Sequence, residues 1–76
     1  MSDRGHVFIV DGDASRADAL QELLEGDGYF VGSTAAGAEA LEGIASAEPN
    51  LVLLDAHLAD VDPFELLEEL KRTQYG

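Results

Sequence analysis

The sequence predicts an α/β fold in which three parallel strands, in the order 2-1-3, are flanked by helices. Short apolar runs alternate with segments of helical periodicity, which gives the element order βαβαβα. This alternation is typical of a parallel sheet covered by helices. The first and third runs, VFIV and LVLL, are the most apolar, so we expect these two strands to lie side by side in the middle of the sheet.

The first strand is expected over residues 6–10, and it ends at Asp11. Two side chains in the next stretch, Asp13 and Ser15, can cap a helix that runs to about Glu25. The apolar positions of this helix recur at helical spacing: Ala17, Leu20 and Leu24, together with Ala19 and Leu23.

Gly26 and Gly28 are expected to end this helix. The run YFV, residues 29–31, predicts a second strand that is less apolar and therefore nearer an edge. Residues 38–46 predict a short helix whose inward side chains are Leu41, Ile44 and Ala45.

Pro49 and Asn50 precede the third strand, which is expected over residues 51–54. Asp62 and Pro63 then provide a cap and a first turn for a third helix. The connections are only a few residues long, so residues 1–76 are expected to form one domain. The third helix has an apolar face and two basic residues that suit its C-terminal end: Phe64, Leu66, Leu67 and Leu70, with Lys71 and Arg72.

Composition limits the possible partners. Sixteen acidic residues against four basic ones give a formal net charge of -12, which argues against direct binding to nucleic acid or to an anionic membrane. A basic partner surface or a cation site is favoured instead. The chain has no cysteine, its first residues do not have the layout of a signal peptide, and no apolar run is long enough for a membrane span. A cytoplasmic location is therefore expected.

The two strands predicted to be neighbours both end in an aspartate. Asp11 follows the first strand and Asp55 the third, 44 positions later (55 − 11). In open parallel sheets, ligands bind beyond the carboxyl ends of the strands, at the point where the strand order reverses. We therefore expect Asp11 and Asp55 to lie together at that point, with Asp13 close by.

Carboxylates gathered in one crevice repel each other, which raises at least one pKa unless a cation is present. Mg²⁺ prefers oxygen ligands and usually takes one or two carboxylates with waters and phosphate oxygens. An aspartate can also accept a phosphoryl group as an acyl phosphate. The pattern thus predicts a site for Mg²⁺ and a phosphoryl group. Nearby residues are given simpler roles: Gly12 in a tight turn, His57 and Asp60 in loops, and Asp62 as a cap.

Three stretches resemble the receiver domains of two-component response regulators. VFIVDGDAS resembles the first strand and acidic turn of that family, and GYFVGSTAAGAEAL resembles its second strand and the start of its second helix. PNLVLLDAHLADVDPFELLEELK resembles the third strand, the phosphoacceptor and the third helix. The resemblance covers roughly residues 6–73 and implies a flavodoxin-like sheet.

By this resemblance, Asp55 accepts a phosphoryl group from a histidine kinase or phosphotransfer protein. Asp11 and Asp55 would help to hold Mg²⁺, as would the backbone carbonyl of His57. Gly12 stands where the family has a second carboxylate that binds the ion, so Asp13 is the candidate substitute.

Receiver domains continue with further strands and helices that bring a switch Thr or Ser and a Lys. These are not among the 76 residues, so the resemblance implies the N-terminal half, a truncated receiver. We expect its third strand to be an exposed edge through which two copies pair as a dimer.

Two alternatives stay open. The chain can be a pseudo-receiver that only binds protein partners, which the glycine at position 12 favours. IVDGD also resembles the start of haloacid-dehalogenase-type phosphatases, with Asp11 as nucleophile and Asp13 as acid/base, but Ala14, Ser15 and Asp55 fit that pattern poorly. We therefore expect a signalling module rather than an enzyme.

Overall fold

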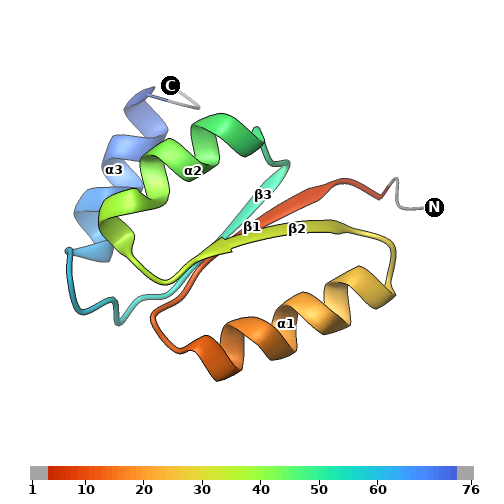
Figure 1. Cartoon of the computed structure of the whole chain (residues 1–76). Coiled ribbons are helices and arrows are strands. Elements are labelled where there is room, and N and C mark those ends of the chain that lie inside the picture. Colours follow the sequence, from red (N-terminus) through yellow and green to blue (C-terminus); the bar gives the residue numbers. More distant parts are fainter. Residues whose placement is uncertain (1–3, 74–76) are drawn as a thin grey trace.

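The computed structural model describes residues 4–73 and confirms the predicted α/β architecture (Figure 1). The three strands form one parallel sheet in the order β2-β1-β3, which is the predicted order. In chain order the elements are β1 (His6–Val10), α1 (Ala14–Gly26), β2 (Phe30–Thr34), the 3-10 turn η1 (Gly37–Glu39), α2 (Ala40–Ala47), β3 (Leu51–Leu54) and α3 (Pro63–Thr73).

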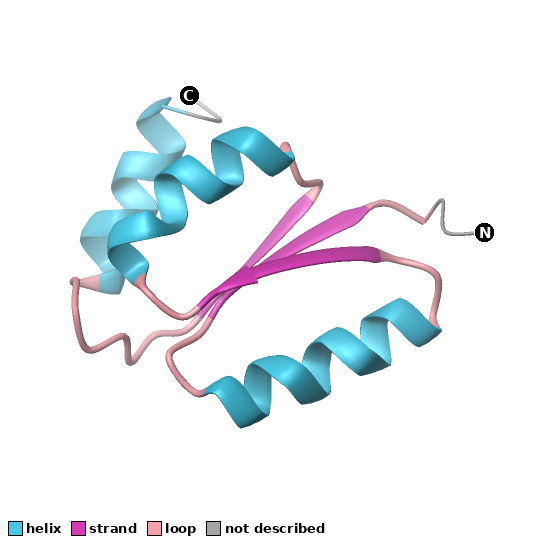
Figure 2. Ribbon diagram, in the orientation of Figure 1, coloured by secondary structure: helices cyan, strands magenta, loops and turns pink. Residues whose placement is uncertain are grey.

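Helices cover both faces of the sheet, with α1 on one face and α2 and α3 on the other (Figure 2). Successive side chains of a strand point to opposite faces. Val7 and Ile9 of β1 therefore pack against the α1 side, while Phe8 and Val10 pack against α2 and α3. Because β1 is buried on both faces, its uninterrupted apolar run suits the central position.

The ring of Phe8 packs against two glycines, Gly32 of β2 and Gly43 of α2. A Cβ atom placed on Gly32 of β2 would lie 3.0 Å from Cδ1 of Phe8, and one placed on Gly43 of α2 would lie 2.7 Å from its Cζ. The two glycines therefore let the sheet and α2 close around this ring.

Two of the predicted elements have different bounds in the structure. The second strand covers Phe30–Thr34 instead of residues 29–31, because its polar end pairs with β1 through Ile9–Ser33 and Val10–Thr34. The second helix begins with the 3-10 turn and continues to Ala47. The strand is longer than predicted because hydrogen bonding to the buried β1 outweighs local propensity.

The helix ends agree with the predicted signals. Asp13 caps α1 with a carboxylate that accepts the Ser15 and Arg16 N–H groups, and Asp62 precedes α3 with a carboxylate that accepts the Phe64 N–H. Helix α1 ends at Gly26, and Gly28 follows with a φ of 97°, a conformation that favours glycine.

Some side chains that we predicted to face inward are exposed. Each lies outside the stripe that its helix packs against the core, since residues two positions apart on a helix point in nearly opposite directions. The exposed positions are Ala19, Leu23, Ala45, Phe64 and Leu67.

Within residues 4–73, no helix has the length and hydropathy needed to cross a membrane.

Candidate functional site

The register of the sheet brings Asp11 and Asp55 together. Val10 is the partner of Leu54 across β1 and β3, and the ladder continues with a hydrogen bond of 2.8 Å from the Asp55 N–H to the Val10 carbonyl. The residue that follows each strand is an aspartate, Asp11 after β1 and Asp55 after β3. Both carboxylates therefore lie at the carboxyl edge of the sheet, at the point where the strand order reverses.

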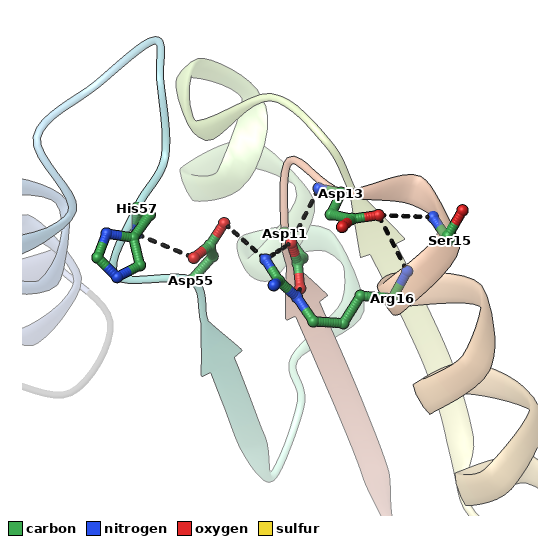
Figure 3. Close-up of polar contacts among 6 residues, drawn as sticks. All are labelled: Asp11, Asp13, Ser15, Arg16, Asp55 and His57. Atoms are coloured by element: carbon green, nitrogen blue, oxygen red, sulfur yellow. Dashed lines mark hydrogen bonds and ion pairs between the residues drawn. The ribbon is translucent and has the colours of Figure 1, made fainter.

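Arg16, in the first turn of α1, joins the two carboxylates (Figure 3). Its Nε donates to Oδ2 of Asp11 at 2.6 Å, and its Nη2 donates to Oδ1 of Asp11 at 2.8 Å. The same Nη2 donates to Oδ2 of Asp55 at 3.3 Å. The aspartate side chains are only 7% and 9% exposed, against 54% for Arg16, so the guanidinium covers two nearly buried carboxylates from the solvent side.

This guanidinium sets the electrostatics of the site. Its hydrogen bond lowers the pKa of Asp11 from 3.8 to about 2, even though burial acts in the opposite direction. The carboxylate of Asp11 in turn raises the pKa of Arg16 above its ordinary value. For Asp11 the shift is opposite to the one expected of a bare carboxylate cluster, because Arg16 supplies the positive charge.

Asp13 supports Asp11 through its main chain. Its backbone N–H donates to Oδ1 of Asp11 at 2.9 Å. Its own carboxylate accepts the N–H groups of Ser15 and Arg16, at 3.0 and 3.2 Å, at the start of α1. The carboxylate of Asp13 is thus engaged at the helix end, while those of Asp11 and Asp55 converge on the guanidinium.

Asp55 is held from two sides. The His57 N–H donates to its Oδ1 at 2.9 Å, while Oδ2 accepts the longer bond of 3.3 Å from Arg16. Beside it is a hollow of about 370 Å³ whose charged lining residues are Asp11, Arg16 and Asp55. The remaining lining is apolar: Ile9, Leu20, Leu53 and Leu54.

The loop that follows Asp55 is fixed by Asp60. Oδ1 of Asp60 accepts the Gly37 N–H at 3.1 Å, and Oδ2 accepts the Ala38 N–H at 3.0 Å. These amides, that of Ala38 above all, lower the pKa of Asp60. The loop assignment made from the sequence is therefore correct, but it did not include this link to the start of η1.

The two site carboxylates fit a small cation. Oδ1 of Asp11 and Oδ2 of Asp55 both bond to Nη2 of Arg16, so they converge on one position. Two carboxylates are what Mg²⁺ usually takes from a protein, with waters and phosphate oxygens completing its octahedron. Across the described residues 4–73, no larger group of three or more His, Asp or Glu side chains could hold a metal ion.

Arg16 is the site residue that the sequence analysis missed. A usable signal was present, because Arg16 places a positive charge in the first turn of a helix, where the helix dipole favours acidic residues. A basic residue at this position goes against the usual preference of a helix start, which indicates that Arg16 has an acidic partner outside the helix. Asp11 lies five positions earlier in the sequence.

A parallel 2-1-3 sheet with two aspartates at its switch point defines a receiver-like α/β protein. The family model for the response regulator receiver domain matches residues 7–76, and the chain belongs to this family. It is therefore a signalling module of the two-component type.

Known proteins show the same relationship. Over 65 residues the chain is 40% identical to the transcriptional regulatory protein ZraR of Klebsiella oxytoca. This alignment covers 86% of this chain and 15% of that protein. The N-terminal domain of a response regulator receiver protein from Methanoculleus marisnigri JR1 has a TM-score of 0.88 at 30% identity, covering 95% of this chain and 58% of that one.

A third similar protein is the response regulator TrrA of Thermotoga maritima, solved in complex with Mg²⁺–BeF. Its TM-score is 0.85 at 25% identity, covering 99% of this chain and 63% of that one. The chain thus spans about 15% of this ZraR protein and less than two thirds of these two solved chains.

Proposed function

We propose that this chain is the phosphoryl-accepting module of a two-component phosphorelay, with Asp55 as the acceptor. The observation that supports this most is the placement of Asp55 at the carboxyl end of β3, next to Asp11 and at the switch point of the sheet. The His57 N–H orients its Oδ1, and the 3.3 Å bond from Arg16 holds its Oδ2.

The donor in this proposal is the phosphohistidine of a histidine kinase or phosphotransfer protein. A carboxylate oxygen of Asp55 attacks the phosphorus, so a P–O bond forms. The P–N bond breaks, and the imidazole nitrogen keeps its electron pair. Phosphoryl transfer depends mainly on positioning and on charge neutralisation, which a bound Mg²⁺ supplies.

The proposed metal ligands are Asp11 and Asp55, together with the backbone carbonyl of His57. Asp13, the fourth candidate, would need to leave its cap on α1 before its carboxylate could reach the ion. We therefore assign Asp13 to positioning, through its N–H bond to Asp11.

A small phosphodonor tests the proposal. Acetyl phosphate or beryllofluoride with Mg²⁺ is expected to give a covalent mass gain or shifts of the amide signals around residue 55. Asp55→Asn should abolish the response, whereas Asp62→Asn, which alters a helix cap in the same loop, should retain it. A response that survives Asp55→Asn, or that is absent from the unaltered chain, contradicts the proposal.

Protein binding without phosphorylation is the second candidate function. Gly12 and the engagement of both site carboxylates by Arg16 favour it. On this alternative, the chain binds its histidine kinase or phosphotransfer partner equally well with or without Asp55→Asn, and no phosphodonor modifies it.

We further propose that the 76-residue polypeptide forms a symmetric dimer through β3 and is cytoplasmic. Among the described strands β3 pairs only with β1, and its Leu51 side chain is 53% exposed. An apolar edge strand presents unpaired backbone groups that a second copy can satisfy.

A further inference from the structure

We propose that the guanidinium of Arg16 is an internal counter-ion that occupies the cation position between Asp11 and Asp55. On this proposal a divalent cation binds only when Arg16 withdraws. The inference goes beyond the proposed function, and it rests on that function for the identity of the cation.

The Arg16 guanidinium and a bound cation would compete for the same space. Nη2 of Arg16 lies 2.8 Å from Oδ1 of Asp11 and 3.3 Å from Oδ2 of Asp55. Mg²⁺ needs oxygen ligands at about 2.0–2.1 Å in a near-ideal octahedron. An ion that bridges these two oxygens and the nitrogen that now bridges them would overlap, so one excludes the other.

The hydrogen bonds between Arg16 and Asp11 also oppose binding of the cation. Arg16 binds Asp11 through two parallel N–H···O bonds, and such two-pronged pairs with carboxylates are among the strongest hydrogen bonds in proteins. The cation must break both bonds. Mg²⁺ affinity is therefore lower than the two carboxylates alone would provide.

The guanidinium can leave the site without disturbing the rest of the fold. The Arg16 side chain is 54% exposed, so it can move into solvent without opening the core. Its backbone N–H stays bonded to Oδ1 of Asp13, and the Asp13 N–H stays bonded to Asp11. Helix α1 and the acidic turn therefore keep their positions when the guanidinium leaves.

A titration with MgCl₂ alone tests the exchange. The amide signals of Asp13 and His57 report on the site, because these N–H groups donate to Asp11 and Asp55. Arg16→Gln should lower the Mg²⁺ concentration at half-saturation by roughly tenfold, the factor expected for losing a charge-assisted pair. Arg4→Gln, which removes the same charge beyond the other end of β1, should leave it unchanged.

A second readout uses the unaltered chain. The Nε–H signal of Arg16, bonded to Oδ2 of Asp11, should move to the position of a solvent-exposed arginine as Mg²⁺ saturates the site. This measurement needs no variant, so it remains decisive if Arg16→Gln fails to fold. Arg16→Lys, which keeps the charge but loses the two-pronged geometry, should show an intermediate affinity.

The inference is overturned if Arg16→Gln binds Mg²⁺ no more tightly than the unaltered chain. It is also overturned if the Nε–H signal stays unchanged at saturation, because cation and guanidinium would then bind together. Neither result affects the proposed function, which fails only if no adduct depends on Asp55.

Discussion

At the scale of single residues, the aspartates of this chain differ in the donors that their carboxylates meet. Those of Asp11 and Asp55 meet a guanidinium at the sheet edge. Asp13 and Asp62 meet backbone amides at the starts of helices, and Asp60 meets amides 22 and 23 residues away in the sequence. One residue type thus serves as site, cap and loop clamp, according to its partners.

The positions of Asp11 and Asp55 could be predicted because each directly follows an apolar strand of a parallel sheet. The role of Arg16 could not be predicted in the same way. Its guanidinium reaches back past the helix start through a long, flexible side chain, whose direction depends on torsions that sequence spacing does not specify. The link from Asp60 to Gly37 likewise depends on how two loops pack.

Asp60 predicts an acid sensitivity. Its carboxylate accepts two amides in the folded chain, which holds its pKa below the ordinary 3.8. The unfolded chain therefore takes up this proton at a higher pH than the native chain. The resulting stabilisation is complete above the unfolded pKa and is lost as the pH falls through the lower native value.

Asp60→Ala should therefore make the free energy of unfolding fall less steeply as the pH decreases from about 5 to about 3. Urea unfolding at a series of pH values measures this slope. Ile44→Val, a buried change that lowers stability without altering a charge, should keep the original slope. An Asp60→Ala slope equal to that of the unaltered chain would refute the role of the clamp.

At the scale of elements, the two most apolar runs were placed correctly as strands. Burial on both faces explains the unbroken apolar run of β1, whereas the residues of β3 are half-buried or exposed. The second strand was only partly predicted. Its residues 32–34 have the sequence GST, and glycine in particular is a poor strand former. They extend along β1 because β1 offers hydrogen-bond partners up to Val10.

Helix α2 predicts an unusual response to alanine. In an ordinary helix, replacing glycine by alanine raises stability by roughly 0.5–1 kcal/mol. In Gly43→Ala, however, the new methyl group would lie 2.7 Å from Cζ of Phe8, whose ring belongs to the buried core. We expect the free energy of unfolding to fall by about 1–3 kcal/mol, the usual cost of overpacking.

The matched control is Gly26→Ala in α1, where a Cβ atom meets nothing within 4 Å. This variant should leave stability unchanged or raise it by up to about 1 kcal/mol. Thermal unfolding of both variants measures the difference. Equal effects at the two positions would show that Phe8 has room for the added methyl group.

At the scale of the whole molecule, the sheet has a charged carboxyl edge and an apolar lateral edge at β3. The proposed dimer covers that lateral edge. Leu51→Lys adds a charge to the edge strand, a change that discourages strand pairing, and it should shift sedimentation toward the monomer.

Leu23→Lys is the control, since Leu23 is equally apolar and is 67% exposed on α1, away from β3. It should sediment like the unaltered chain. A monomer at every concentration of the unaltered chain would contradict pairing through β3.

The central claim is that the paired strand ends make Asp55 a phosphoryl acceptor. An acyl phosphate is reduced by borohydride to an alcohol, so a phosphorylated aspartate becomes homoserine and its position can be read by peptide mass spectrometry. After treatment with acetyl phosphate and Mg²⁺, we expect homoserine at position 55. Homoserine at another aspartate such as Asp11, or at none, would contradict the account.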